Sequence, residues 1–490
     1  MITAVIAISD SLPPERNLVG LLGHSLVRKA YLLKDGKLPD APSGCRFLTC
    51  DSPFSGETWN TLREAITTPY ILFAPWTDEI RIDPRAPERL VAAAKATGAA
   101  LVYADYAEEA GGTLREHPLI DYQAGSLRDG FSFGPLILLE TAAIGRAIRK
   151  YGPIPAYRWA GWYDLRLKLS ADRTLFHLPE RLCTVAAEPG GTGSAHFAYV
   201  DPRNRLLQEE MEAAATAHLK RIGAYLAPEW KDMPAYPDSF AQEASVIIPV
   251  RNRVRTVAEA VQSALRQQTD FAFNVLVVDN HSTDGTTKLL ADLAGRHPAL
   301  HHLVPERRDL SIGGCWNEAI FSAPCGRYAV QLDSDDLYSG KDTLQRLVDL
   351  LRREKCAMAV GSYTLVNERL AEIPPGLIDH REWTEANGRN NALRINGLGA
   401  PRAFATALLR RIGFPNVGYG EDYAVALRLC REYRIGRIYE SLYLCRRWEG
   451  NTDAALSVEQ ANRYDLYKDR LRTMEIAARR KLNGVRRWRS

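Results

Sequence analysis

Long apolar runs, paired cysteine spacings and a strong net charge are all missing from this 490-residue sequence. No stretch approaches the roughly 18 uncharged apolar residues of a membrane-spanning helix, and the N-terminus lacks the basic segment of a secretory signal. The eight cysteines are scattered without a CxxC pair, which favours reduced thiols over disulfides or a zinc site. A formal net charge of +4 gives no basis for binding nucleic acid. These absences predict a cytoplasmic protein.

What the sequence does contain is two stretches in which predicted strands alternate with predicted helices, a pattern typical of α/β domains. Three prolines fall within residues 228–238, a composition typical of a linker. A chain of this length is comfortable for two domains. We therefore predict a first domain over residues 1–235, a second over 240–478 and a basic tail over 479–490.

The most informative stretch is Tyr328–Tyr338, in which an apolar strand runs into the sequence DSDD. Ionised carboxylates are costly in a low-dielectric interior, so three of them at the end of a buried strand need water, basic partners or a metal ion. Asp333 and Asp335 are two residues apart and point the same way in extended backbone. This spacing suits a Mg²⁺ or Mn²⁺ ion that also binds a diphosphate. The alternative is an acidic loop in which Asp336 or Ser339 caps the next helix.

Polar residues also follow two earlier predicted strands of the second half. Residues 245–250 and 274–278 are continuous apolar runs, as in buried parallel strands, and they end in Arg251-Asn252 and in Asp279. In an open parallel sheet, ligands bind beyond the C-terminal ends of the strands. We therefore expect these side chains and the carboxylates of the DSDD segment to lie close together.

Five segments of the second half together resemble the family 2 glycosyltransferases, which have the GT-A fold. In chain order they are SVIIPVRNR, VVDNHSTDGT, GGCWNEAI, QLDSDDLY and GYGEDYAVALRL, within a match from about Ser245 to Trp448. The resemblance implies a Rossmann-like nucleotide-diphospho-sugar transferase domain, a divalent metal and an inverting transfer. It implies a nucleotide-sugar donor, with a UDP-sugar as the first expectation. The acceptor stays open among a saccharide, a lipid-linked sugar and a peptide.

Residue roles follow from the matching motif positions. The donor-binding positions that the resemblance implies are Pro249, Arg251, Asn252, Asp279, Asn317, Asp333, Ser334 and Asp335. Asp335 and Asp333 are also the expected metal ligands, with Asp335 the stronger candidate and Asp333 nearer the ribose. Asp422 matches the catalytic base, and its neighbour Glu421 is the alternative. One carboxylate is enough for an inverting transfer, because it only has to accept the proton of the acceptor hydroxyl.

The first half of the chain can be aligned with the second half. Residues 70–73 align with 328–331, which sets Pro75-Trp76-Thr77-Asp78 against DSDD, and further on Trp162 aligns with Asp422. Proline and tryptophan can neither bind a metal nor accept a proton. The alignment predicts two tandem GT-A domains, the first a degenerate and non-catalytic copy. The alternative is a chance likeness between two unrelated α/β domains.

Two surface features predict interactions with other molecules. Trp59, Trp76, Trp159 and Trp162 fall near the predicted mouth of the first domain, where they could form an acceptor platform or simply fill the vacated pocket as core. Residues 479–489 hold six basic side chains and one tryptophan, a composition that suits anionic lipid at the inner face of a membrane. A solvated tail is the alternative.

Two other functions stay open at this point. A sugar nucleotidyltransferase would favour a glycine-rich basic loop after its first strand, whereas this chain has VRNRVRT without glycine. A nucleotide-sugar-binding or scaffold protein would need two inactive domains. The DSDD and GED segments argue against that for the second domain.

Overall fold

The computed structural model describes residues 1–8, 21–34, 43–75, 79–186, 201–235, 239–448, 451 and 456–487. The chain divides into two compact units. The N domain comprises Met1–Tyr199, Asn204–Tyr225 and Leu456–Ser490, and the C domain comprises Val200–Arg203 and Leu226–Ala455. The C-terminal stretch therefore belongs to the N domain, whereas the predicted ranges placed it in the second domain and in a separate tail.

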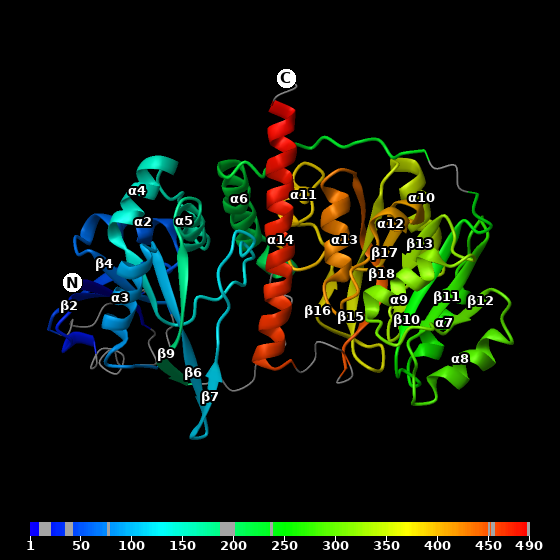
Figure 1. The fold of residues 1–490 in the computed structure, drawn as a ribbon, viewed down its shortest axis with the longest axis horizontal. Helices are drawn as coiled ribbons and strands as arrows, with labels where there is room; N and C mark the ends of the chain where they lie inside the picture. Colours follow the sequence, from blue (N-terminus) through cyan, green and yellow to red (C-terminus); the bar gives the residue numbers. More distant parts are fainter. Residues whose placement is uncertain are drawn as a thin grey trace. The chain divides into compact units, whose positions relative to one another are not determined.

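The N domain contains a nine-stranded mixed sheet with the order β3-β2-β1-β4-β8-β6-β9-β5, and β7 pairs with β6. Its strands are β1 (Ile2–Ala7), β2 (Val27–Lys34), β3 (Cys45–Thr49), β4 (Tyr70–Ala74), β5 (Ile80–Ile82), β6 (Leu101–Ala110), β7 (Thr113–His117), β8 (Ile137–Glu140) and β9 (Leu175–Ala186). Its helices are α2 (Gly56–Ala65), α3 (Ala86–Thr97), α4 (Thr141–Tyr151), α5 (Gly161–Ser170), α6 (Arg205–Arg221) and α14 (Val458–Arg487) (Figure 1).

The C domain contains a second nine-stranded sheet with the order β12-β11-β10-β13-β17-β15-β18-β14, and β16 pairs with β15. Its strands are β10 (Ala244–Val250), β11 (Phe273–Asp279), β12 (Leu300–Leu303), β13 (Tyr328–Gln331), β14 (Leu337–Tyr338), β15 (Met358–Val366), β16 (Glu372–Ile378), β17 (Arg402–Ala405) and β18 (Ile435–Arg446). Its helices are α7 (Val257–Leu265), α8 (Thr286–Ala294), α9 (Ile312–Phe321), α10 (Thr343–Glu354), α11 (Gly388–Asn391), α12 (Thr406–Ile412) and α13 (Glu421–Cys430).

The two sheets have the same topology. When the strands are numbered along the chain, β1 to β9 take the same places in the first sheet as β10 to β18 take in the second. The register also agrees, because Tyr70 pairs with Glu140 between β4 and β8 as Tyr328 pairs with Ala405 between β13 and β17. The predicted fold class, two tandem α/β domains, is confirmed.

Side-chain contacts repeat as well at aligned positions. Asn60 of α2 donates to the carbonyl of Ile154 at 2.9 Å and accepts from its N–H at 3.4 Å. Asn317 of α9 makes the same two bonds with Phe414, both at 2.8 Å. A paired bond of this kind fixes a turn against a helix, so the same local device is used in both domains.

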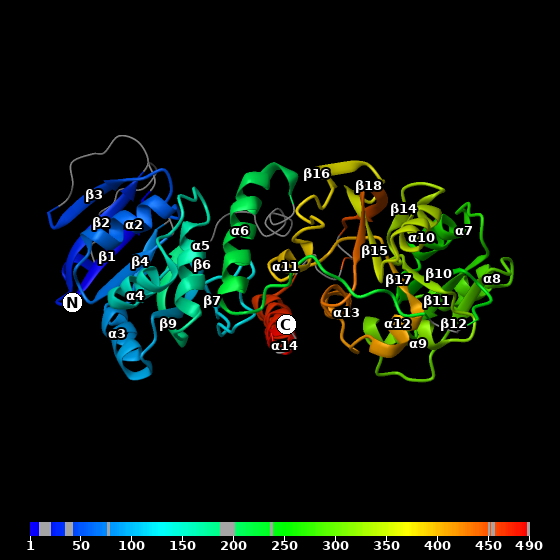
Figure 2. The same ribbon diagram turned by 90° about the horizontal axis from the view of Figure 1, so that it is seen from above.

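The arrangement of the C domain brings its strand ends to one edge. β10, β11, β12 and β13 run parallel, so their C-terminal ends meet at the same side of the sheet. Every residue of β10 is buried because helices cover both faces. Figure 2 shows α9, α12 and α13 on one side of the sheet and α7 and α10 on the other. Loops beyond this edge are therefore the place to look for a site.

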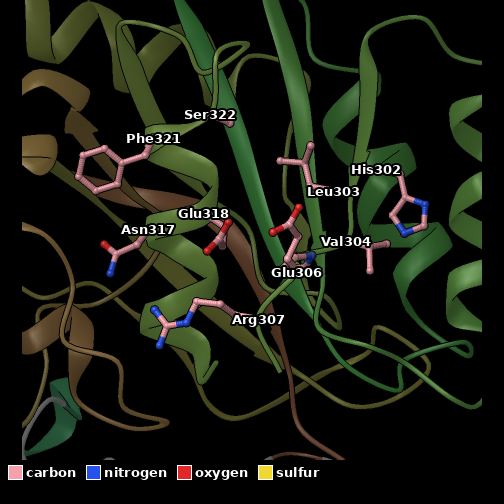
Figure 3. Close-up of a pocket in the computed structure, with 10 residues that line it drawn as sticks. His302, Leu303, Val304, Glu306, Arg307, Asn317, Glu318, Phe321 and Ser322 are labelled. Atoms are coloured by element: carbon pink, nitrogen blue, oxygen red, sulfur yellow. The ribbon is translucent and has the colours of Figure 1, made fainter. Parts of the chain in front are cut away.

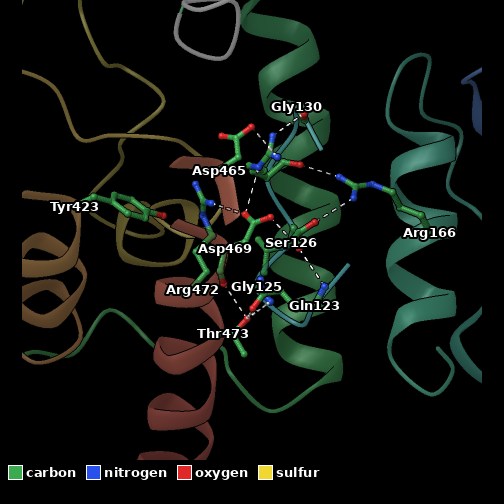
Figure 4. Close-up of polar contacts among 12 residues, drawn as sticks. Gln123, Gly125, Ser126, Gly130, Arg166, Tyr423, Asp465, Asp469, Arg472 and Thr473 are labelled. Carbon is green, nitrogen blue, oxygen red and sulfur yellow. Dashed lines mark hydrogen bonds and ion pairs between the residues drawn. The ribbon is translucent and has the colours of Figure 1, made fainter. Parts of the chain in front are cut away.

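Helix α14 attaches to the N domain through buried charges rather than an apolar stripe. The side chains of Asp469 and Arg472 are fully buried. Asp469 accepts hydrogen bonds from Ser126 at 2.9 Å, from Arg128 at 3.3 Å and from Arg472 at 2.8 Å (Figure 4). A Cβ on Gly125 would lie 2.1 Å from the Asp469 carbonyl oxygen, so the helix can approach only because this residue is glycine.

The residues predicted to form a basic tail are helical as far as Arg487. Arg479 is fully buried and donates to Glu475 at 2.8 Å, and Asn483 donates to the carbonyls of Gly223 and Tyr225. Arg479 is thus not available to a lipid surface. Membrane contact through the remaining basic residues stays a prediction. Among the residues that the structure describes, no helix is both long and apolar enough to cross a membrane.

Replacing Asp469 with alanine is expected to destabilise the N domain by about 3–5 kcal/mol, the usual cost of breaking a buried ion pair. The matched control is Asp465→Ala. Asp465 pairs with the same Arg128 at 2.9 Å but is 35% exposed, so its loss should cost at most about 1 kcal/mol. Denaturant unfolding measures both, with the C-domain transition as internal reference. Equal effects of the two substitutions would contradict the prediction.

Candidate active site

The carboxylates of the DSDD segment lie beyond the C-terminal end of β13. Both carboxylate oxygens of Asp333 accept from the Gln331 amide at 2.9 Å, and its backbone N–H donates to the Tyr443 hydroxyl at 3.0 Å. Asp335 accepts from the Trp448 indole N–H at 3.1 Å, and its carboxylate lies 3.8 Å from Nε of Arg253. Two carboxylates thus sit at the strand end with basic and aromatic neighbours from other loops.

The third carboxylate, Asp336, is more deeply buried than the other two. It is 5% exposed and accepts from the backbone N–H of Arg446 at 2.7 Å. Burial, together with the charges of Asp333 and Asp335, raises the pKa of Asp336 well above its usual value. The capping alternative is wrong, because the residue before α10 is Asp342 and no side chain caps that helix.

Helix α13 brings the two candidate bases to the same place. Asp422 forms an ion pair with Arg402, which comes from β17, and Asp422 also accepts from the backbone N–H of Tyr423 at 2.7 Å. The Asp422 side chain is 24% exposed, whereas Glu421 is only 6% exposed as a residue. Burial, together with the charge of Asp422, raises the pKa of Glu421 to about 8. Asp422 is therefore the better placed of the two to accept a proton.

Arg402 is the residue that the sequence did not reveal. Burial alone would lower the pKa of its guanidinium, but Asp422 and Asp333 outweigh that effect and raise it. Burial raises the pKa of Asp333 above its usual value, and Arg402 acts in the opposite direction. Arg402 thus links the end of β13 to the start of α13 electrostatically. Its neighbours in sequence, Pro401 and Ala403, carry no signal of this role.

The predicted residues after β10 hold the neighbouring loops together. The Asn252 backbone has a positive φ of 54°, its N–H donates to Ser282 at 2.9 Å, and its side-chain oxygen accepts from the Thr283 N–H at 2.8 Å. Arg251 is exposed, and Pro249 is buried in the strand opposite Val278. These residues join the two loops that follow β10 and β11 at the same edge as the carboxylates.

Asp279 and Ser334 are built into the same framework. Asp279 is fully buried and accepts from the Ser282 N–H at 3.0 Å, from the Thr287 hydroxyl at 2.5 Å and from His302 at 3.3 Å. Burial by itself would raise the pKa of Asp279, but these hydrogen bonds outweigh it and lower the pKa. The carbonyl of Ser334 accepts from the Thr256 hydroxyl at 3.0 Å. Nucleotide contacts of both residues stay predictions.

The carboxamide of Asn317 is engaged by the backbone of Phe414. Asn317 lines a groove of about 710 Å³ between β12 and α9 (Figure 3). Figure 3 shows His302 and Val304 on the strand side and Glu318 and Phe321 on the helix side. None of the carboxylates of the DSDD segment lines this groove. The predicted contact of Asn317 with the donor is not tested by this geometry.

The corresponding positions of the N domain are neutral. Counting from the shared register, Pro75 corresponds to Asp333 and Ile137 to Arg402. α5 and α13 both have ten residues, so Trp162, the second residue of α5, corresponds to Asp422. Trp76, Thr77 and Asp78 lie outside the described residues.

Comparison with known families bears directly on this cluster. Residues 245–417 match the family model described as Glycosyl transferase family 2. The C domain is a family 2 glycosyltransferase domain. The match includes the DSDD segment and Arg402 and ends before Glu421 and Asp422, so the roles of these two rest on their motif and geometry. The shared strand order of the two sheets agrees with the expected tandem GT-A domains.

Relatives of the family 2 domain align over limited parts of their length. An uncharacterized glycosyltransferase of Rickettsia felis is 27% identical over 202 residues, which are 41% of this chain and 32% of the relative. The uncharacterized glycosyltransferase YfnE of Bacillus subtilis is 30% identical over 121 residues, 25% of this chain and 30% of the relative. The chain thus spans about a third of the length of these curated relatives.

Two solved structures are similar at low identity. The crystal structure of S. aureus TarS 1-349 in complex with UDP-GlcNAc is 22% identical, covers 48% of this chain and 72% of that chain, and has a TM-score of 0.37. The mannosyltransferase PcManGT from Pyrobaculum calidifontis, in complex with GDP-Man and Mn²⁺, is 19% identical, covers 58% and 83%, and has a TM-score of 0.35.

The donor atoms at the end of β13 suit a hard divalent cation. Mg²⁺ and Mn²⁺ prefer oxygen ligands and bind through one or two carboxylates when phosphate oxygens and water complete the shell. Asp333 and Asp335 supply such carboxylates, and both remain partly exposed. No group of three or more acidic, histidine or cysteine side chains that could hold a metal occurs among the described residues. The protein alone therefore offers a partial ligand set that fits a cation bound together with a diphosphate.

The raised pKa of Glu421 predicts a pH-dependent stability of the family 2 domain. Between its ordinary pKa of 4.5 and about 8, the folded state holds a proton that the unfolded chain has released. The free energy of unfolding should therefore fall as pH rises through this window. Glu421→Gln removes the titrating group and should flatten this decline in metal-free buffer. Denaturant midpoints at several pH values measure it, and an unchanged slope in the variant would contradict the assignment.

Proposed function

We propose that the family 2 domain transfers a sugar from a nucleotide-diphosphate donor, with a UDP-sugar as the first candidate, to an acceptor hydroxyl with inversion. The observation that carries this proposal is the Asp422–Arg402 ion pair beside the carboxylates at the end of β13. It places a partly exposed carboxylate next to the site expected to hold the donor diphosphate. An acceptor hydroxyl that approaches Asp422 can pass its proton to that carboxylate as the new bond forms.

Arg402 has two tasks in this proposal. Its positive charge lies beside the Asp422 carboxylate, and a neighbouring cation favours the charged form of a carboxylate. It also orients Asp422, since the guanidinium is itself held by the carbonyl of Gly399 at 3.1 Å. Glu421 is held protonated at neutral pH by burial and serves as packing rather than as a base.

Asp335 and Asp333 would hold a divalent cation, which would stabilise the negative charge of the leaving diphosphate as a Lewis acid. Trp448 and Arg253 orient Asp335 from two sides, by a hydrogen bond of 3.1 Å and an ion pair of 3.8 Å. Arg253 also lies over the Trp448 ring, with 5.9 Å to its centroid. These neighbours fix the carboxylate before the donor binds.

The N domain is proposed to be non-catalytic. Its positions corresponding to Asp333, Arg402 and Asp422 are Pro75, Ile137 and Trp162, none of which can bind a cation or accept a proton. Metal-dependent chemistry is therefore assigned to the C domain alone.

The test is hydrolysis and transfer with a panel of UDP-, GDP-, dTDP- and CMP-sugars, with and without Mn²⁺ or Mg²⁺. Cleavage of at least one donor only in the presence of the metal supports the proposal. The anomeric configuration of the product, read by NMR, tests inversion. Binding of nucleotide without turnover of any donor on any acceptor would favour a binding protein instead.

A further inference from the structure

The N domain contains a cavity of about 310 Å³ at the position that the active site has in the C domain. Pro75, Ile137 and Trp162 line this cavity, and they are the counterparts of Asp333, Arg402 and Asp422. A volume of this size is at the lower end of small-molecule sites. The cavity is therefore the vacated equivalent of the catalytic cleft, and what it can bind depends on what replaced the charges.

At the position of Asp422 the charge is replaced by an aromatic ring, Trp162. Trp162 packs on Trp59, with 5.1 Å between centroids, and on Phe73 at 5.3 Å. Trp59 is fully buried and belongs to the core, whereas Trp162 and Trp159 are only half-buried and line the cavity. The core alternative thus holds for Trp59. Trp159 and Trp162 both line the cavity. The packing of Trp162 on Trp59 and Phe73 fixes the orientation of its ring before any ligand arrives.

Polar side chains stand beside these rings. Asp129 and Arg166 line the same cavity. Arg166 is held in place by the carbonyls of Ser126 at 3.2 Å and Arg128 at 2.8 Å, and its guanidinium lies over the rings of Tyr163 and Phe133. A hydrocarbon tail would offer no polar group to these two side chains, whereas a hydroxylated ligand can exchange hydrogen bonds with them.

We propose that this cavity binds a neutral saccharide ring. A pyranose has an apolar C–H face that can lie on an indole and a rim of hydroxyls that can meet a carboxylate and a guanidinium. A nucleotide diphosphate does not fit, because the positions that would hold its metal and charge are proline, isoleucine and tryptophan. The binding itself is independent of catalysis. Only the further step, that this saccharide belongs to the acceptor or product, rests on the proposed function.

The test is saturation-transfer NMR on the full-length protein with three neutral probes, maltotriose, cellotriose and chitotriose. At least one probe is expected to receive saturation on its C–H face and to bind in the millimolar range. Trp159→Ala and Trp162→Leu should each weaken that binding by about tenfold, the usual size of a loss at an aromatic hot spot. Trp159 lines the cavity from the segment before α5, so its variant keeps the test valid if Trp162→Leu disturbs the fold.

Trp230→Ala is the matched control, because this half-buried tryptophan lies in the C domain near Arg389 and should leave binding unchanged. The measurement follows binding and no transfer, so that failure of this inference and failure of the proposed function can be told apart. Absence of binding for all three probes, or equal binding by wild type and both cavity variants, would overturn the proposal. Binding of 1-octanol in place of every sugar would overturn it in favour of a lipid tail.

Discussion

Asp422→Asn is expected to lower the rate of sugar transfer by about 10²–10⁴-fold, the usual contribution of a positioned general base. Asparagine is close in shape to aspartate and can still meet Arg402, but its amide cannot accept the proton of the acceptor hydroxyl. Donor affinity should stay within a few-fold, because Asp422 lies on α13 whereas the proposed donor contacts come from the loops after β10, β11 and β13. Steady-state kinetics with the identified donor and acceptor, combined with titration of the donor, separates the two effects.

The control for this substitution is its neighbour. Glu421→Gln mimics the protonated side chain that burial already maintains, so transfer at neutral pH should remain close to the wild-type rate. If Asp422→Asn transferred normally and Glu421→Gln did not, Glu421 would be the base. Arg402→Lys separates charge from orientation. It keeps the positive charge beside Asp422 but loses the planar guanidinium that also reaches Gly399.

Asp335→Ala is expected to abolish metal-dependent donor binding. Substitution of groups that only orient a metal ligand typically costs 10–100-fold in metal affinity, so removal of the ligand itself should cost about 100-fold or more. Calorimetric titration of UDP in the presence of Mn²⁺ measures the loss directly. Binding of UDP without the metal should change much less, because the predicted nucleoside contacts come from other loops.

Two control substitutions accompany Asp335→Ala. Asp336→Asn replaces a buried carboxyl whose pKa is raised well above its usual value by burial and by the charges of Asp333 and Asp335, and it should keep metal-dependent binding. Asp78→Ala changes the aligned segment of the N domain, which lies outside the described residues, and it should have no effect. Equal losses in Asp335→Ala and Asp78→Ala would show that the first domain also binds nucleotide through this segment.

The sequence predicted the strand-end cluster because its signals are local. Asp333, Asp335 and Asp336 follow an apolar strand directly, and Glu421 and Asp422 open a helix. The rule that ligands collect at the C-terminal ends of parallel strands then brings them together without any knowledge of side-chain packing. The same local periodicity was enough for the two α/β domains.

Arg402 could not be predicted in this way. It reaches Asp333 only because β17 returns antiparallel beside β13, some 70 residues along the chain. Asn252, Asp279 and Asn317 were predicted from the sequence to contact the donor, and these contacts stay predictions. Their polar groups hold turns and helices in place, and a sequence does not distinguish a side chain that binds a ligand from one that supports the loop beside it.

Helix α14 was missed for a different reason. The face that it turns toward the N domain carries Asp469, Arg472 and Arg479, so a search for an apolar stripe does not detect it. Charges can be buried when each meets a partner in good geometry, as Asp469 does with Ser126 and Arg128. Such pairing is a property of the folded chain and leaves no periodic signal.

The position of α14 at the end of the chain also sets the order in which the protein can mature on the ribosome. Ser126 and Arg128 are synthesised early, but the carboxylate that they bind arrives only after the whole C domain. At about 5–20 residues per second, the stretch Leu226–Ala455 delays it by about 10–50 s. Until then Ser126 and Arg128 of the nascent N domain lack the Asp469 carboxylate, a state that chaperones and proteases can recognise. Chains whose synthesis stops within the C domain should therefore be degraded completely, including the N domain.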